Sequence, residues 1–169
     1  MDSPSYLQQT RDEILNRCSG LSPELAQFRP EPNSWSVLEI IEDLAVVECA
    51  SWIGIKRTLN QPEAEPTVLA ETTTKQAILE SNVPNPTNKI TAPAQTMPTG
   101  RFGLWPAALA AFQKASANVL EAASSNNPFL HRHVMPRPVI GLLTLAQWLF
   151  FAAAHAASHT IQIEQVLCK

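Results

Sequence analysis

Two long helices are predicted by the sequence, and each opens with a capping box. In Ser36-Val37-Leu38-Glu39 and Thr144-Leu145-Ala146-Gln147, the first hydroxyl and the fourth side chain each satisfy an exposed backbone N–H at the helix start. The apolar residues that follow predict helices over 37–59 and from Thr144 to about Leu167. In 37–59 these residues cover more than one stripe, which is typical of a helix at the centre of a bundle.

Two further helices fit the same architecture. The first starts with Ser3 as the N-cap residue and Pro4 in the first helical position, and Gly20 closes it after Cys18. The second begins near Trp105 and extends to about residue 123. The chain of 169 residues is typical of one compact domain, so we expect a single all-α domain, a four-helix bundle spanning 1–169.

The connections are rich in proline. Residues 60–104 should contain a short helix over 72–81 and an extended loop over 82–101, and Ser22-Pro23 begins one extra turn. We expect no strand in 134–140, because that segment contains two prolines and lacks clean alternation.

Composition and charge exclude several classes of protein. The net charge is −3 and no Lys/Arg cluster appears, so we expect no nucleic-acid partner. The N-terminus does not resemble a signal peptide, and no run of about 18 apolar residues predicts a membrane span. The three cysteines form no CxxC motif, so we expect free thiols in the cytoplasm.

The residues that carry chemistry are two histidines and one acid. His155 and His159 lie one turn apart on the apolar face of the last helix, where both imidazoles can reach one divalent ion. Asp43 is an isolated carboxylate on the inward face of the helix over 37–59. If these faces meet, the three side chains converge on a site for Zn²⁺, Ni²⁺ or Fe²⁺ with open positions for water or substrate.

Two interpretations of the remaining polar residues stay open. Asp43 can instead form a buried ion pair with a protonated His155 or His159, without metal. His131 and His133, in the connection before the last helix, are expected to be solvated, or else to supply an extra ligand or a proton relay. The four tryptophans (Trp35, Trp52, Trp105 and Trp148) are expected to anchor the core, and the alternative role for one of them is to line a substrate pocket.

Two motifs resemble those of a known family. The segment from Trp35 to Leu44, with the lead-in Arg29–Ser34, resembles the motif that opens the second helix of the DinB-like (YfiT-like) superfamily. The segment Gly141–Leu149, followed by His155, His159, Gln162 and Ile163, resembles the last-helix motif of that family. The resemblance covers nearly the whole chain in order and spacing.

The resemblance implies an up-up-down-down bundle, often a homodimer, with Ni²⁺ or Zn²⁺ held by three histidines. His155 and His159 match the two ligands on the last helix, whereas Asp43 stands where the second helix normally supplies a histidine. Ser158 stands where an arginine is usual. Relatives include enzymes that use a low-molecular-weight thiol as a co-substrate.

Two functions remain open from the sequence. The first is a metal-dependent S-transferase or hydrolase that acts on a small electrophile, with Asp43, His155 and His159 as the metal ligands. Its general acid or base is not identified. The alternative is a degenerate, non-catalytic bundle that binds a small molecule or a protein partner.

Overall fold

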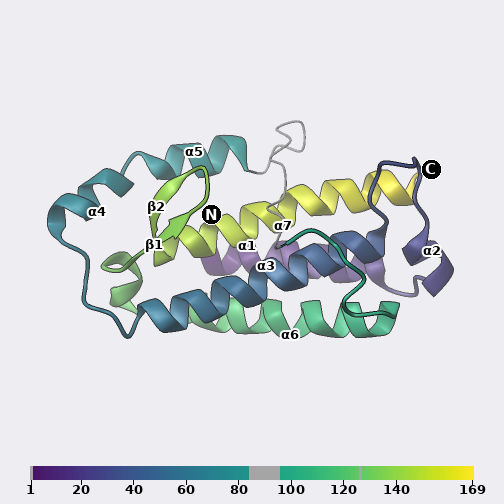
Figure 1. The fold of residues 1–169 in the computed structure, drawn as a ribbon, viewed down its shortest axis with the longest axis horizontal. Helices are drawn as coiled ribbons and strands as arrows, with labels where there is room; N and C mark the ends of the chain where they lie inside the picture. The colour runs from purple at the N-terminus through teal and green to yellow at the C-terminus, as the bar shows by residue number, and fades with distance from the viewer. Residues whose placement is uncertain (1, 84–95, 126) are drawn as a thin grey trace.

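Four long helices form the bundle in the computed structural model, which describes residues 2–83, 96–125 and 127–169 (Figure 1). They are α1 (Ser3–Cys18), α3 (Val37–Thr58), α6 (Trp105–Ser124) and α7 (Leu145–Leu167). The shorter elements are α2 (Pro23–Gln27), α4 (Pro66–Thr72), α5 (Lys75–Asn82), the 3₁₀ helix η1 (Pro128–His131) and two strands, β1 (Val134–Arg137) and β2 (Gly141–Thr144). The prediction of an all-α four-helix bundle is confirmed.

Local signals fix the starts of the long helices. Both capping boxes are present, because Ser36 and Thr144 each accept from a backbone N–H and receive the reciprocal bond from the fourth residue. At α1 the prediction is off by one residue, because the Asp2 carboxylate, rather than the Ser3 hydroxyl, accepts from the backbone N–H of Ser5 at 2.8 Å. A carboxylate at this position also interacts favourably with the helix dipole.

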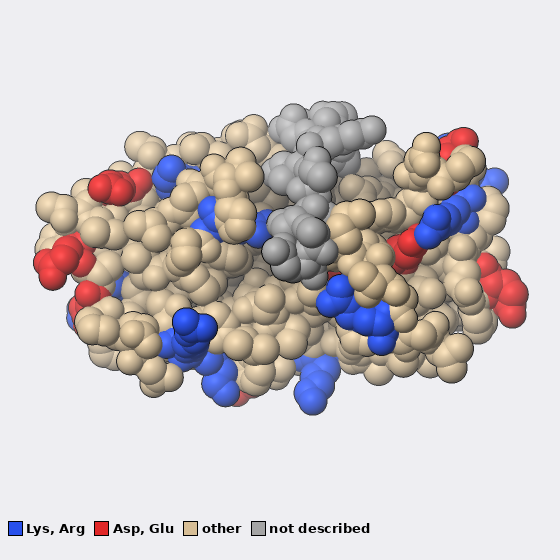
Figure 2. Space-filling model, in the orientation of Figure 1, with Lys and Arg blue, Asp and Glu red and all other residues tan. Residues whose placement is uncertain are grey.

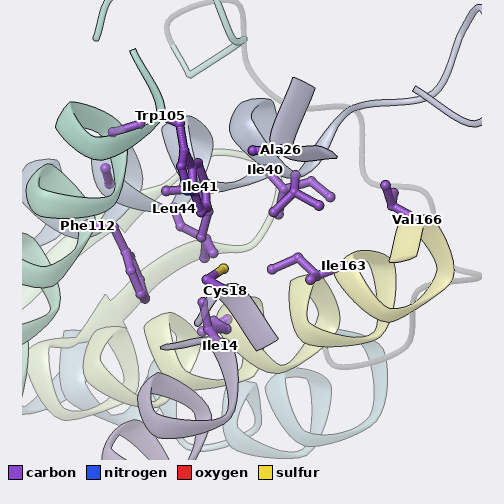
Figure 3. Close-up of a cluster of buried hydrophobic side chains, with 14 residues drawn as sticks. Ile14, Cys18, Ala26, Ile40, Ile41, Leu44, Trp105, Phe112, Ile163 and Val166 are labelled. Carbon is purple, nitrogen blue, oxygen red and sulfur yellow. The ribbon is translucent and has the colours of Figure 1, made fainter. Parts of the chain in front are cut away.

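The direction of the helices differs from the expected order. In the cluster of Figure 3, the ends of α1 and α7 (Cys18 and Ile163) lie with the starts of α3 and α6 (Ile41 and Trp105). Helices α1 and α7 therefore run one way and α3 and α6 the other, an up-down-down-up order rather than up-up-down-down. The connection carrying α2 returns the chain at once, so α3 runs antiparallel to α1, whereas the long connection between α3 and α6 takes the chain back along the bundle and makes these two helices parallel.

That long crossover contains two short helices instead of the single one expected over 72–81. Helix α4 ends at Thr72, and α5 begins at Lys75, so the break falls at Thr73 and Thr74. The fully buried Leu79 of α5 packs into a cluster with Phe151 of α7. Most of the extended loop predicted over 82–101 lies in residues 84–95, outside the described residues.

The segment before α7 forms a β-hairpin, so the prediction of no strand there is wrong. Strands β1 and β2 pair antiparallel, and Pro136 lies opposite Leu142. A two-stranded sheet has only edge strands, and these tolerate proline because one side makes no ladder bonds. Val139 (φ 72°) and Gly141 (φ 90°) adopt left-handed backbone angles that close the turn.

The hairpin packs onto both central helices. The indole Nε1 of Trp148 donates to the Met135 carbonyl at 2.9 Å, which ties β1 to α7. Met135 also lies against α3 at Gly54, where an added Cβ would stand 2.6 Å from the Met135 sulfur. The missing side chain at Gly54 therefore lets the hairpin approach α3 closely.

The described helices and the cysteines can be compared with the predictions of no membrane span and of free thiols. Within the described residues, no helix combines the length and apolar character needed to cross a bilayer. The three cysteines are free, with Cys18 buried and Cys49 and Cys168 exposed.

Candidate metal centre

Three side chains from α3 and α7 converge inside the bundle. The Asp43 Oδ2 atom lies 3.1 Å from His159 Nε2 and 3.4 Å from His155 Nε2. The two Nε2 atoms are themselves 3.2 Å apart. Asp43, His155 and His159 are the one group of three or more potential metal ligands that the described part of the chain brings together. The juxtaposition expected from the sequence is therefore present.

The separations fit a shared cation. Ligand atoms about 2.1 Å from one ion stand about 3.0 Å apart at a right angle and about 3.4 Å apart at the tetrahedral angle. All three pairs of ligand atoms fall close to this interval. Two imidazole nitrogens and one carboxylate oxygen also form a donor set that suits Zn²⁺, Ni²⁺ and Fe²⁺.

Gln162 orients one of the imidazoles for ligation. Its Oε1 atom lies 2.9 Å from His159 Nδ1, and an amide oxygen can only accept, so Nδ1 carries the proton. In the neutral imidazole, Nε2 then presents a lone pair toward Asp43 Oδ2 and His155 Nε2. Two acceptors, His159 Nε2 and Asp43 Oδ2, then face each other at 3.1 Å, and a cation between them removes their repulsion. An outer hydrogen bond such as that of Gln162 is characteristic of metal-bound histidines.

Aromatic rings hold both histidines. Trp35 stacks on His159 with ring centroids 6.2 Å apart, and Phe151 stacks on His155 at 5.6 Å. The side chain of Asp43 is only 2% exposed, whereas that of His155 is 19% exposed. Trp35 is thus the tryptophan that lines the site, and the site faces solvent on its His155 side.

Electrostatics keep His155 in its neutral form. Desolvation lowers the pKa of His155 well below the usual value, and the nearby His159 and Arg137 lower it further. Asp43 Oδ1 and His155 Nδ1 are buried and have no hydrogen-bond partner among the residues that the structure describes. The centre therefore offers a neutral imidazole and a carboxylate with spare acceptor capacity, both of which favour binding a cation.

Arg137 is a residue near the centre that sequence reasoning missed. Its guanidinium carbon lies 4.2 Å from the Phe151 ring centroid and 5.5 Å from that of Trp148. Desolvation lowers the pKa of Arg137, and the charge of Asp43 opposes that shift. No sequence signal could have placed Arg137 here, because it reaches the site only through the unexpected hairpin.

Glu42, the neighbour of Asp43, fastens the end of the crossover to α3. Its buried carboxylate accepts from the backbone N–H groups of Thr99 (2.7 Å) and Gly100 (3.0 Å) and from Arg101 Nε (3.1 Å). Desolvation opposes ionisation of Glu42, but these hydrogen bonds outweigh it and lower its pKa. The last residues of the crossover are therefore held beside the α3 turn that carries Asp43.

The Glu42→Gln variant is expected to lose about 3 kcal/mol of unfolding free energy at pH 7, because a buried charge partner is removed. A lowered pKa stabilises the folded state above the unfolded pKa, near 4.5, and this contribution disappears as the pH falls through the folded value. Urea denaturation from pH 3 to 7 measures both effects, with exposed Glu71→Gln as the control. Equal stability of the two variants at pH 7 would contradict the role of Glu42.

The other two histidines take no part in the centre. His131 is exposed, as expected. The prediction of a solvated His133 is wrong, because its ring is buried, with Nδ1 and Nε2 each 3.0 Å from a backbone carbonyl, those of Phe129 and Gln61. A ring engaged in this way fastens the hairpin entry to the end of α3 and is not an additional ligand.

The fold and site together define a four-helix bundle with a candidate metal centre between α3 and α7. Residues 6–163 match the family model of the DinB superfamily, and the chain belongs to this family. It is 23% identical over 167 residues to the uncharacterized protein YuaE of Bacillus subtilis, covering 96% of this chain and 95% of YuaE. A crystal structure of TT2238, a four-helix bundle protein, is similar in fold, with a TM-score of 0.61, 19% identity and 96% of each chain covered.

Proposed function

We propose that the protein is a metal-dependent enzyme that uses Asp43, His155 and His159 to hold one divalent cation, Zn²⁺, Ni²⁺ or Fe²⁺. The observation that carries the proposal is the triangle of Asp43 Oδ2 and the two Nε2 atoms, with sides of 3.1, 3.2 and 3.4 Å. Three protein ligands leave further positions free, which is the mark of a catalytic rather than a structural site.

The reaction class follows from what such a centre offers. A divalent cation bound there lowers the pKa of a thiol or of water and so supplies a nucleophile at neutral pH. We infer that a small thiol or water attacks a small electrophile, which makes the protein an S-transferase or a hydrolase. The chain's own residues contribute orientation, because Gln162 and Trp35 fix the His159 ring and Phe151 fixes that of His155.

The surface agrees with a small-molecule substrate better than with a nucleic acid. On the face shown in Figure 2, Lys and Arg lie in small separate groups among uncharged residues, without a continuous basic stripe. The net charge of the chain is −3. Nucleic-acid binding needs clustered positive charge, since most of its affinity comes from phosphate contacts.

The metal content of an Asp43→Asn variant tests the proposal. Protein purified without a nickel column and loaded with Zn²⁺ is expected to retain about one ion per chain, and D43N should bind at least about 100-fold more weakly, because the amide lacks the charge. Elemental analysis after gel filtration measures the stoichiometry. Stability alone does not separate this function from a metal-free ion pair, because both lose a buried partner.

Thiol binding tests the finer assignment. Co²⁺-loaded protein is expected to develop a sulfur-to-cobalt charge-transfer band with 2-mercaptoethanol, and metal-loaded D43N should not. Retention of metal without any band would point to the hydrolase rather than the S-transferase. Absence of metal from the wild-type protein would favour the non-catalytic bundle, in which Asp43 pairs with a protonated histidine.

A further inference from the structure

Arg137 is a cation beside the centre, and the nearby charge of Asp43 acts on it without a direct ion pair. Among the residues that the structure describes, no hydrogen bond or ion pair engages its guanidinium, and its Nε atom is buried and unpartnered. Arginine carries five N–H donors, and leaving the buried Nε–H of this charged group without a partner is costly. The unpaired donor therefore points to a partner that does not belong to the chain.

Two aromatic rings hold Arg137 near the centre. Its guanidinium carbon lies over the rings of Phe151 and Trp148, and Phe151 also stacks on His155. One aromatic side chain thus contacts both the arginine and a candidate ligand. Arg137 and His155 are both partly exposed, so each side chain keeps an edge open to solvent.

We propose that Arg137 binds an oxyanion, a carboxylate or phosphate group, on the small molecule whose reacting atom is directed to the Asp43–His155–His159 centre. This inference rests on the proposed function, because it concerns the substrate of that same site. A guanidinium fixed by stacking suits this task, since its planar donors match two oxygens of one anion and little side-chain freedom is left to lose.

The geometry favours this role over a purely structural one. If the stacking of Arg137 only held the hairpin in place, an apolar side chain at this position would do so equally well. The hairpin is also already tied to α7 by the hydrogen bond from Trp148 to Met135. Arg132 provides the contrast on the same connection. It lies 5.8 Å from the Phe129 ring centroid and is paired with Glu63 at 3.5 Å, so its charge is satisfied within the chain.

Two thiols that differ in charge test the proposal on Co²⁺-loaded protein. Mercaptoacetate carries a carboxylate and 2-mercaptoethanol does not, and the charge-transfer band reports the binding of either. The Arg137→Met variant is expected to bind mercaptoacetate about 10- to 100-fold more weakly and 2-mercaptoethanol within about twofold of wild type. The control variant Arg132→Met should leave both affinities unchanged.

The outcomes separate the two proposals. Equal effects of Arg137→Met on both thiols, or no effect on either, would overturn the role of Arg137 while leaving the metal function in place. A wild-type protein that holds Co²⁺ but gives no band with either thiol would remove the S-transferase assignment. In that case an NMR titration of the metal-free protein alone tests the anion site.

The NMR titration tests the anion site with neither metal nor a variant. In ¹⁵N-labelled metal-free protein, the Arg137 Nε–H signal is expected to move saturably when sodium acetate or inorganic phosphate is added. A larger response to acetate identifies a carboxylate as the preferred anion, and a larger response to phosphate identifies a phosphate. A shift that is linear and equal for Arg137 and Arg132 would show only general ionic effects and would refute the site.

Discussion

Adding Zn²⁺ to metal-free protein is expected to raise its melting temperature by about 5 to 10 °C when the ion is present at 100 times its dissociation constant. A ligand bound only by the folded state contributes about 2.7 kcal/mol at that concentration, and each kcal/mol shifts the melting temperature by about 2–4 °C for a chain of this size. Differential scanning calorimetry with and without chelator measures the shift.

The matched variants for this experiment are both histidine substitutions. His159→Gln should abolish the stabilisation, because His159 contributes one of the three converging atoms. His131→Gln should retain all of it, because His131 is exposed and lies outside the centre. A shift that survives in His159→Gln but disappears in His131→Gln would place the ion elsewhere.

Glu48 is expected to make the protein less stable as the pH rises. This residue of α3 is only 2% exposed, and desolvation raises its pKa to about 8, against a weaker opposing effect of Arg11. Between the unfolded pKa, near 4.5, and about 8, the folded state keeps a proton that the unfolded state has lost. The free energy of unfolding should therefore fall with rising pH, by on the order of 5 kcal/mol in total.

The Glu48→Gln variant should remove most of that slope, because glutamine imitates the protonated acid and does not titrate. Urea denaturation at pH 5, 7 and 9 compares it with wild type and with exposed Glu121→Gln. The free energy of unfolding of Glu48→Gln, relative to that of wild type, is expected to rise from pH 5 to pH 9. That of Glu121→Gln should follow wild type. Parallel curves for all three proteins would mean that Glu48 is ionised in the folded state.

Local signals in the sequence predicted the parts of the fold that depend on neighbouring residues. The capping boxes at Ser36 and Thr144 are complete within four residues, so they did not need tertiary information. The meeting of Asp43 with the two histidines was also predictable, because helical spacing places each on an inward face and an unpaired buried carboxylate is costly.

Features that depend on tertiary contacts were not predictable in the same way. Pro136 argued against a strand, but the hairpin is held by Trp148 and by the space over Gly54, which lie on two different helices. Arg137 becomes part of the site only through that hairpin. His133 was expected in solvent because its burial depends on a carbonyl from Gln61, distant in the sequence.

Anomalous diffraction from crystals grown with Zn²⁺, recorded on both sides of the zinc edge, tests the central claim most directly. A single strong peak is expected between α3 and α7, about 2.0–2.2 Å from a carboxylate oxygen of Asp43 and from the Nε2 atoms of His155 and His159. No peak at this position, with Asp43 hydrogen-bonded directly to His159, would contradict the account.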